Sequence, residues 1–277
     1  MVTIKKVFNA AILALLVVSC SNETIRVSDE IITREYNFDN ISALEVATDF
    51  KAYVTFSETE ESVKIQANEN LFGRINVLKE GGRLRVKLDD NISIRGKETL
   101  NVFITTQNIT DFKASSDSEI YLDMPLTNES VAINLSSDAY FEGEITTKNL
   151  EISGTSDSKV DVLLTADEAN INLSSGADLE GECKVGKATF KLSSDSTVDL
   201  QGTITTMNAI LSSDSKLKDY GLNIEDLKIS LSSDSDSYVT VSKTIDVTAN
   251  SDSRLFYKGD AEIINQNLSS DGKVIKE

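Results

Sequence analysis

Apolar and polar residues alternate with a period of two on both sides of a recurring polar stretch in the last two thirds of the chain. In one copy, Phe190 and Leu192 precede the polar stretch Ser193–Ser196, and Val198 and Leu200 follow it. Alternation with this period is typical of β-strands that bury one side. The polar stretch between two such segments predicts a corner that joins two strands.

The corner returns at a nearly constant spacing along the chain. Its third residue, which we call the marker, is Asp in eight copies and Gly in one, and successive markers lie 18 to 21 residues apart. A fixed period of this length predicts a solenoid of stacked repeats. Because the repeats show strand periodicity, we predict an all-β fold, a right-handed parallel β-helix of about 19 residues per coil with three short strands in each coil. The markers are Asp117, Asp138, Asp157, Gly176, Asp195, Asp214, Asp234, Asp252 and Asp271.

Serine occupies the position before the marker in every copy. By the parity of the neighbouring apolar positions, this serine is expected to point into the core, where stacked hydroxyls would satisfy one another. The sequence therefore predicts a structural corner ladder of serines. Its members are Ser116, Ser137, Ser156, Ser175, Ser194, Ser213, Ser233, Ser251 and Ser270.

The marker aspartates have two interpretations. The first is a turn former, because Asp tolerates a left-handed backbone, and Gly176 in place of Asp favours it. The second is a calcium ladder on consecutive corners, with Asp195, Asp214 and Asp234 as the ligands, because calcium prefers several carboxylate oxygens. Cations two residues after the marker, such as Lys216, offset the repulsion between carboxylates without a metal. The sequence favours the turn former.

The segment 31–108 lacks the marker but is rich in strand patterns, and Glu80-Gly81-Gly82 is typical of a hairpin turn. We expect an antiparallel lead-in that caps the first coil, followed by β-helix repeats over residues 109–277. No matching cap follows the last coil, which predicts self-association through the C-terminal coil. The expected strands are Ser42–Thr48, Ala52–Phe56, Ser62–Ala67, Ile75–Lys79, Arg83–Leu88 and Leu100–Thr105.

The first twenty residues have the pattern of an export signal. A basic start at Lys5 and Lys6 precedes an apolar run that is too short to span a bilayer, and Val17-Val18-Ser19-Cys20 resembles the lipobox of bacterial lipoproteins. That resemblance implies a signal peptide over residues 1–19 and a lipid anchor on Cys20. Residues 20–30 would then form the lipidated end and the tether, on an outer membrane lipoprotein of the cell envelope.

Composition excludes several function classes. The chain has no histidine, which rules out Ser-His-Asp and Cys-His catalytic pairs and His-ligated zinc. Its net charge of −18, which removal of the signal would make more negative, disfavours nucleic acid as a partner. With Cys20 acylated, Cys183 has no disulfide partner and is expected to be a small buried core residue. No cofactor motif is present.

Several short motifs resemble the head GIN domain family of putative auto-transporter adhesins, a family of unknown function. They are Arg34–Ile41, with an aromatic residue before the first strand, then Gly82–Val86 and Leu100–Ile104, and last the passage from Ile109 through Phe112 into Ala114–Ser118. The family usually has a Ser-Gly-rich corner where this chain has Ser-Ser-Asp-Ser. The resemblance implies a β-helical domain outside the cytoplasm, and no catalytic residues come with it.

Three functions are compatible with this sequence. The first is a non-enzymatic surface-binding module or adhesin that holds a carbohydrate or protein along the rod, with Tyr121, Tyr140 and Tyr220 as candidate sugar platforms. The second is a polysaccharide-active enzyme, which would need two carboxylates about 5 to 10 Å apart. The third is a structural envelope spacer. The regular coils, with no long loop to wall a cleft, favour the first over the second.

Overall fold

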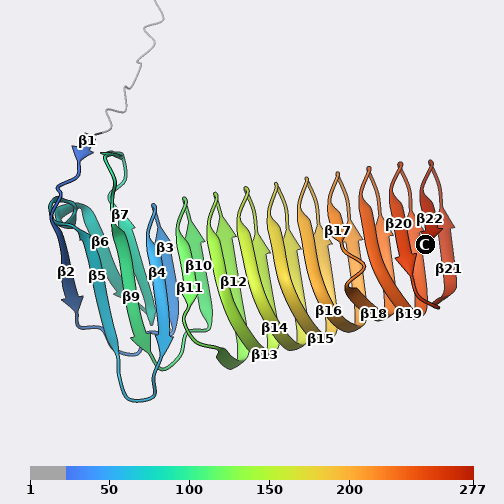
Figure 1. The fold of residues 1–277 in the computed structure, drawn as a ribbon, viewed down its shortest axis with the longest axis horizontal. Helices are drawn as coiled ribbons and strands as arrows, with labels where there is room; N and C mark the ends of the chain where they lie inside the picture. Colours follow the sequence, from blue (N-terminus) through green and yellow to red (C-terminus); the bar gives the residue numbers. More distant parts are fainter. Residues whose placement is uncertain (1–22) are drawn as a thin grey trace, which may run out of the picture.

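The computed structural model describes residues 23–277, which form an extended rod of stacked β-coils with a β-rich end (Figure 1). Strands make up 68% of the described residues, and the solenoid has about nine turns of about 19 residues each. The all-β solenoid predicted from the repeats is therefore confirmed. Within the described residues, no helix has the length and apolarity needed to cross a bilayer.

The regular coils consist of one long strand and one corner. Three consecutive strands of 15 residues each pair in parallel, so that Lys159 lies beside Asp178, and Asp178 beside Thr197. We expected three separate short strands per coil. Instead, the ladder continues through the other bends of the coil, and a corner of four residues completes the repeat. These strands are β14 (Lys159–Leu173), β15 (Asp178–Leu192) and β16 (Thr197–Leu211).

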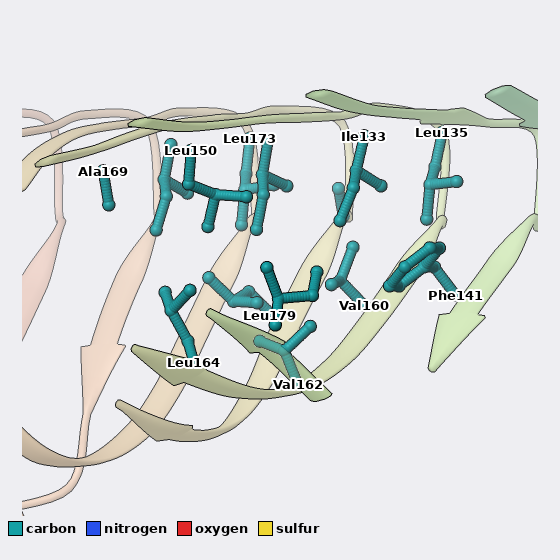
Figure 2. Close-up of a cluster of buried hydrophobic side chains, with 14 of the residues drawn as sticks. Ile133, Leu135, Phe141, Leu150, Val160, Val162, Leu164, Ala169, Leu173 and Leu179 are labelled. Atoms are coloured by element: carbon teal, nitrogen blue, oxygen red, sulfur yellow. The ribbon is translucent and has the colours of Figure 1, made fainter. Parts of the chain in front are cut away.

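The interior of the rod is a set of apolar columns that run along its axis. Phe141, Val160 and Leu179 occupy equivalent places in successive coils, and all three are fully buried (Figure 2). Burial of one such side chain contributes roughly 1.5–3 kcal/mol. A single coil has only the coils beside it to cover its apolar residues, so each coil depends on its neighbours for a core.

Each corner contains two consecutive residues with a left-handed backbone. Ser194 has a φ of 54° and Asp195 a φ of 64°, and the N–H of Ser196 donates to the carbonyl of Ser193 at 3.3 Å. Two positive φ angles inside such a bond are the pattern of a type I′ turn. Asp and Gly tolerate this backbone, which explains both residue types at the marker position.

The predicted inward ladder of serines is wrong in its position. The two left-handed residues shift the alternation of side chains, so the serine before the marker points into solvent and the residue after the marker points inward. All nine predicted serines are exposed and have φ between 46° and 55°. They are Ser116, Ser137, Ser156, Ser175, Ser194, Ser213, Ser233, Ser251 and Ser270.

A buried row of small residues does exist immediately after the markers. The hydroxyl of Ser196 accepts a hydrogen bond from the N–H of Ser193 at 3.0 Å and donates to the carbonyl of Leu173 in the preceding coil at 3.2 Å. Ser215 repeats both bonds one coil later. Ala139 and Ala177 occupy the same buried position, so small size is the common requirement and the hydroxyl is an addition.

The N-terminal end carries the antiparallel layer that the sequence predicted. β5 lies between β2 and β9 and pairs antiparallel with both, and β6 and β7 form a hairpin through Gly81 and Gly82. Both glycines have positive φ, as a two-residue hairpin turn requires. These strands are β2 (Ile31–Tyr36), β5 (Ser62–Asn68), β6 (Ile75–Glu80), β7 (Arg83–Leu88) and β9 (Leu100–Thr106).

One unit of the solenoid ladder lies within residues 31–108. β3 (Ala43–Ala47) pairs in parallel with β7 on one side and β10 (Asp111–Ser115) on the other. In the same way, β4 (Lys51–Phe56) lies between β9 and β11 (Glu119–Leu122). Thr48 and Asp49, both with a φ of 62°, form the corner between β3 and β4. The lead-in and the repeats are thus joined by one continuous ladder (Figure 1).

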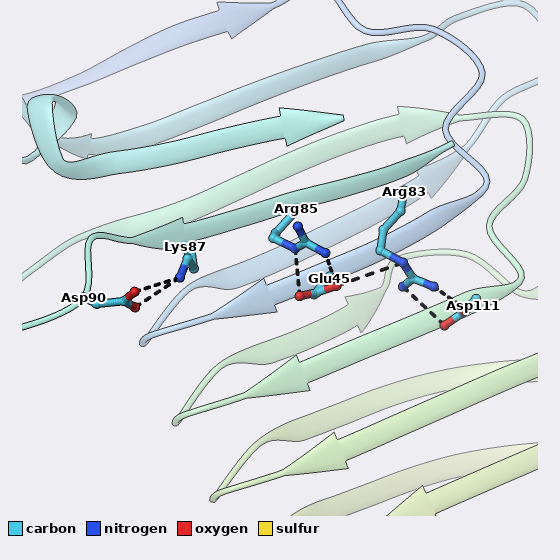
Figure 3. A network of polar contacts seen from close by, with 6 residues as sticks. All are labelled: Glu45, Arg83, Arg85, Lys87, Asp90 and Asp111. Carbon is cyan, nitrogen blue, oxygen red and sulfur yellow. Dashed lines mark hydrogen bonds and ion pairs between the residues drawn. The ribbon is translucent and has the colours of Figure 1, made fainter. Parts of the chain in front are cut away.

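Ion pairs link β7 to β3 and, across β3, to β10 (Figure 3). Arg83 of β7 bridges to Asp111 of β10, and the Nε of Arg85 lies 2.9 Å from Glu45 of β3. Because all of these side chains are partly exposed, each pair contributes at most about 1 kcal/mol. Their main effect is on the order of the strands, because they favour the placement of β7 next to β3 and near β10.

The remaining strands extend the rod in both directions. β1 (Glu23–Arg26) pairs in parallel with β8 (Ile92–Arg95), so part of the expected tether is a strand. At the other end, β21 pairs only with β19 and β22 only with β20, which leaves an open edge among the described residues. The other strands are β12 (Leu126–Ser136), β13 (Tyr140–Gly154), β17 (Lys216–Lys218), β18 (Leu222–Leu231), β19 (Asp236–Ala249), β20 (Arg254–Lys258), β21 (Glu262–Leu268) and β22 (Lys273–Lys276).

The buried row after the markers predicts a large effect of side-chain volume. Ser196→Leu should destabilise the rod by about 1–3 kcal/mol through overpacking. Ser194→Asn, two residues earlier, should leave stability nearly unchanged, because Asn tolerates the left-handed backbone and its side chain would lie in solvent. Thermal unfolding followed by circular dichroism measures both. Equal destabilisation by the two variants would contradict the inward position of Ser196.

Candidate functional site

The outward positions of the coils form long rows, and one face combines aromatic and charged residues. We call the row four residues after the markers the charged row. It has aromatic residues towards both ends and carboxylates in between. From β4 to β20, its residues are Tyr53, Tyr121, Glu142, Asp161, Glu180, Asp199, Lys218, Tyr238 and Phe256.

Aromatic rings near the N-terminal end stack on one another. The ring of Tyr53 lies 5.3 Å from that of Phe103 and 5.4 Å from that of Tyr121, nearly parallel to both, and Tyr140 continues the series at a tilt of 59°. The hydroxyl of Tyr121 donates to Glu119 at 2.6 Å, and burial together with this bond raises the pKa of Tyr121. Because their faces cover one another, Tyr53 and Tyr121 do not form an open platform for a sugar ring.

The third candidate platform belongs to a separate cluster near the C-terminal end. Tyr220 meets Tyr238 edge to face at 5.9 Å, and Tyr238 stacks on Phe256 at 4.7 Å. The Nζ atom of Lys258 lies 4.1 Å from the centre of the Tyr220 ring. A cation over the ring occupies the face that a sugar would need. Since Tyr220 belongs to this second cluster, the structure does not bring it together with Tyr121 and Tyr140.

The middle of the charged row is a column of carboxylates on adjacent strands. Glu142, Asp161, Glu180 and Asp199 are successive partners in the parallel ladder. Burial raises the pKa of Asp161, and Glu180 and Glu142 raise it further, while Lys159 opposes them. Lys159 also pairs with Glu180 at 2.6 Å. The carboxylates of the column therefore repel one another, and Lys159 compensates only part of this repulsion.

The corner aspartates have a backbone role. The N–H of Asp195 donates to the carbonyl of Ser213, and the N–H of Asp214 to that of Ser233, both at 3.0 Å. These bonds join each corner to the next, while the side chains of Asp195, Asp214 and Asp234 are exposed. Within residues 23–277, no group of three or more His, Cys, Asp or Glu side chains is placed to hold a metal ion. The positive φ angles and these backbone bonds support the turn former.

The structure tests the prediction for only one of the two cysteines. Cys183 is buried, as predicted, and burial raises the pKa of its thiol to about 11, so the thiolate is scarce at neutral pH. Cys20, the expected lipid anchor, lies outside the described residues, as does the whole predicted signal peptide.

A second face, which sequence reasoning did not single out, carries mostly Ser, Thr and Asn, together with Lys113, Lys191 and Ile210. We call it the hydroxyl face, and it comprises the outward positions two and four residues before the markers. Two hollows of about 340 and 410 Å³ lie on it and share Ser153 and Thr155. The signal was visible in the sequence as a column of Ser and Thr two residues before the markers, but its exposure depends on the corner geometry.

A family profile described as "Putative auto-transporter adhesin, head GIN domain" matches residues 37–182 and 150–261. The chain belongs to this head GIN domain family. Its predicted resemblance to the family is therefore confirmed. No curated protein matches the chain.

Solved structures share the fold of this head GIN domain protein at low identity. A putative adhesin from Parabacteroides merdae has a TM-score of 0.72 at 14% identity, over 92% of this chain and 99% of the other. A putative adhesin from Parabacteroides distasonis has a TM-score of 0.72 at 12% identity, over 92% and 100%. A protein from the same species titled a putative lipid binding protein has a TM-score of 0.62 at 14% identity, over 92% and 100%.

The corner geometry predicts that chelators leave the rod intact. Since the aspartates at the corners act through their backbone, EDTA should not change the melting temperature, and added calcium should not raise it. Thermal unfolding with and without each reagent measures this. A fall with EDTA that calcium reverses would establish a metal site and contradict the turn-only role.

The carboxylate column predicts a stabilising substitution. The pKa of Asp161 is higher in the folded protein than in the unfolded chain. Between these two pKa values the folded protein binds more protons, so the free energy of unfolding falls as the pH rises through this range. Asp161→Asn should therefore raise the melting temperature at neutral pH and weaken its pH dependence. Asp167→Asn, an exposed change on the same strand outside the column, is the matched control and should do neither.

Proposed function

We propose that this chain is a non-enzymatic, lipid-anchored protein of the cell envelope that acts as an adhesin or surface-binding module. Family membership and the fold shared with putative adhesins support binding at the cell surface. The lipobox at Cys20 supports the anchor. Cys20 stands three residues before β1, at the capped end of the rod, and the last coil lies at the opposite end (Figure 1).

This arrangement extends the binding faces away from the anchor. The strands stack about 4.8 Å apart, so nine turns reach roughly 40 Å from the cap. The outward rows repeat at every coil, so a long partner could contact several equivalent positions at once. Contacts repeated in this way strengthen binding without requiring any single strong site.

Two features favour binding over polysaccharide cleavage. The carboxylates of the charged row form a continuous column, with Lys159 paired to Glu180, and they are not among the residues lining the two hollows of the hydroxyl face. A glycosidase places one acid and one base on opposite sides of a bound sugar. In this structure the carboxylate column of the charged row and the hollows of the hydroxyl face lie on different rows, which favours binding over cleavage on these two faces.

The anchor can be tested by metabolic labelling with a radioactive fatty acid. The wild-type protein should take up label, and Cys20→Ser should abolish it. Cys183→Ser is the matched control, because Cys183 is buried in the rod, and it should keep the label. Label retained by Cys20→Ser would contradict an anchor at this residue.

Surface exposure separates an adhesin from a periplasmic spacer. Protease added to intact cells should degrade the protein, and cells that lack it should adhere less to host matrix or to other cells. Protection in intact cells, with degradation only after the outer membrane is opened, would place the protein in the periplasm and contradict the adhesin.

A further inference from the structure

The hydroxyl face differs in charge from the rest of the surface. The chain has 45 acidic and 27 basic residues, yet the larger hollow on this face is lined by no carboxylate, and the smaller one by a single carboxylate, Glu45, together with Lys113. The one charged residue that lines the larger hollow is Lys191, and its remaining polar lining residues are Ser, Thr and Asn. The net negative charge of the protein repels an anionic polymer, whereas a neutral, hydroxyl-rich ligand can approach this face without that repulsion.

Hydrogen-bonding groups on this face are free to bind a ligand. Within the described chain, the side chains of Asn172, Ser174 and Ser193 make no hydrogen bond to another protein group, and none of the three is fully buried. The charged row behaves differently, since its Tyr121 donates to Glu119 and its Glu142 accepts a hydrogen bond from Tyr140. Free donors and acceptors are therefore present where this face is hollowed.

The free groups also repeat in register. One outward position recurs on each of the neighbouring strands β13, β14, β15 and β16, where it is occupied by Ser153, Asn172, Lys191 and Ile210. A ligand along the rod would therefore meet one polar or apolar contact at each strand step of about 4.8 Å. Ile210 is 54% exposed and adds an apolar contact beside the hollow. The two hollows share lining residues and together reach from β3 to β16 along the rod.

We infer that the hydroxyl face binds a linear, uncharged polysaccharide whose chain runs parallel to the rod. This ligand supplies hydroxyl groups at a regular interval, which the repeated Ser, Thr and Asn side chains can match, and an apolar sugar face that Ile210 can contact. Its lack of charge suits a carboxylate-free hollow on an acidic protein. The inference deepens the proposed function, because it names the ligand class and the face.

The test uses the full protein, purified in detergent, and a panel of neutral linear polysaccharides: a β-glucan, an α-glucan, a mannan and a xylan. Native electrophoresis through gels that contain each polymer should show retardation by at least one of them. Ser174→Glu with Ser193→Glu fills the hollow and adds two carboxylates, and should weaken the affinity at least about tenfold, a change of about 1.4 kcal/mol.

The matched control adds the same charge elsewhere. Thr203→Glu with Thr206→Glu changes two exposed positions outside the hollows and should leave the affinity within about twofold, which is under 0.5 kcal/mol by the same relation. Circular dichroism shows whether each variant is folded, and Asn172→Ala gives a milder probe of the same site. Retardation by no polymer, retardation only by an acidic polysaccharide, or equal weakening in hollow and control variants would overturn the inference.

Adhesion assays separate this inference from the proposed function. Cells that carry the Ser174→Glu and Ser193→Glu variant and still adhere fully would refute the hydroxyl face and leave the adhesin standing. A second outcome is also decisive. If the purified protein binds a polymer through this face, but cells without the protein adhere as well as wild-type cells, the adhesin is refuted and the binding site stands.

Discussion

The structure depends on the hydrogen-bonded ladder that joins each coil to the next. No coil can bury its own apolar residues, so the strands are stable only as a stack, and the stack requires every coil to turn at the same place. The corner supplies that turn with two left-handed residues, and the N–H of one marker bonds to the carbonyl of the following corner. Register, core and surface rows all follow from this repetition.

The repeat length and the fold class could be predicted from the sequence because they depend only on periodicity. The six strands expected before residue 108 appear within one residue of their predicted ends, and the hairpin at Gly81 and Gly82 is present. The strand from Ile31 to Tyr36 was not predicted. Its alternation is weak because it lies at the edge of the cap and buries little.

Two features of the ladder could not be predicted by counting along the chain. The prediction assumed that side chains alternate between the core and solvent through the corner, as they do in an extended backbone. The two left-handed residues of the corner interrupt this alternation, so Ser196 points into the core instead of Ser194. The corner at Thr48 and Asp49 lacks the Ser-Ser-Asp-Ser pattern, and Ser116, whose carbonyl accepts a hydrogen bond from the N–H of Asp49, is far away in sequence. The insertion of β3 between β7 and β10 is a long-range property that local patterns do not encode.

The corner explains why function lies on the outward rows. It fixes which side chains leave the core, and so separates a charged, aromatic row from a face of free hydroxyl and amide groups. Native-state thiol labelling measures this separation directly. Cysteine introduced by Ser194→Cys should react quickly in the folded protein, whereas Ser196→Cys should stay protected until unfolding, as the buried Cys183 does. Rapid labelling at residue 196 with protection at residue 194 would contradict the account.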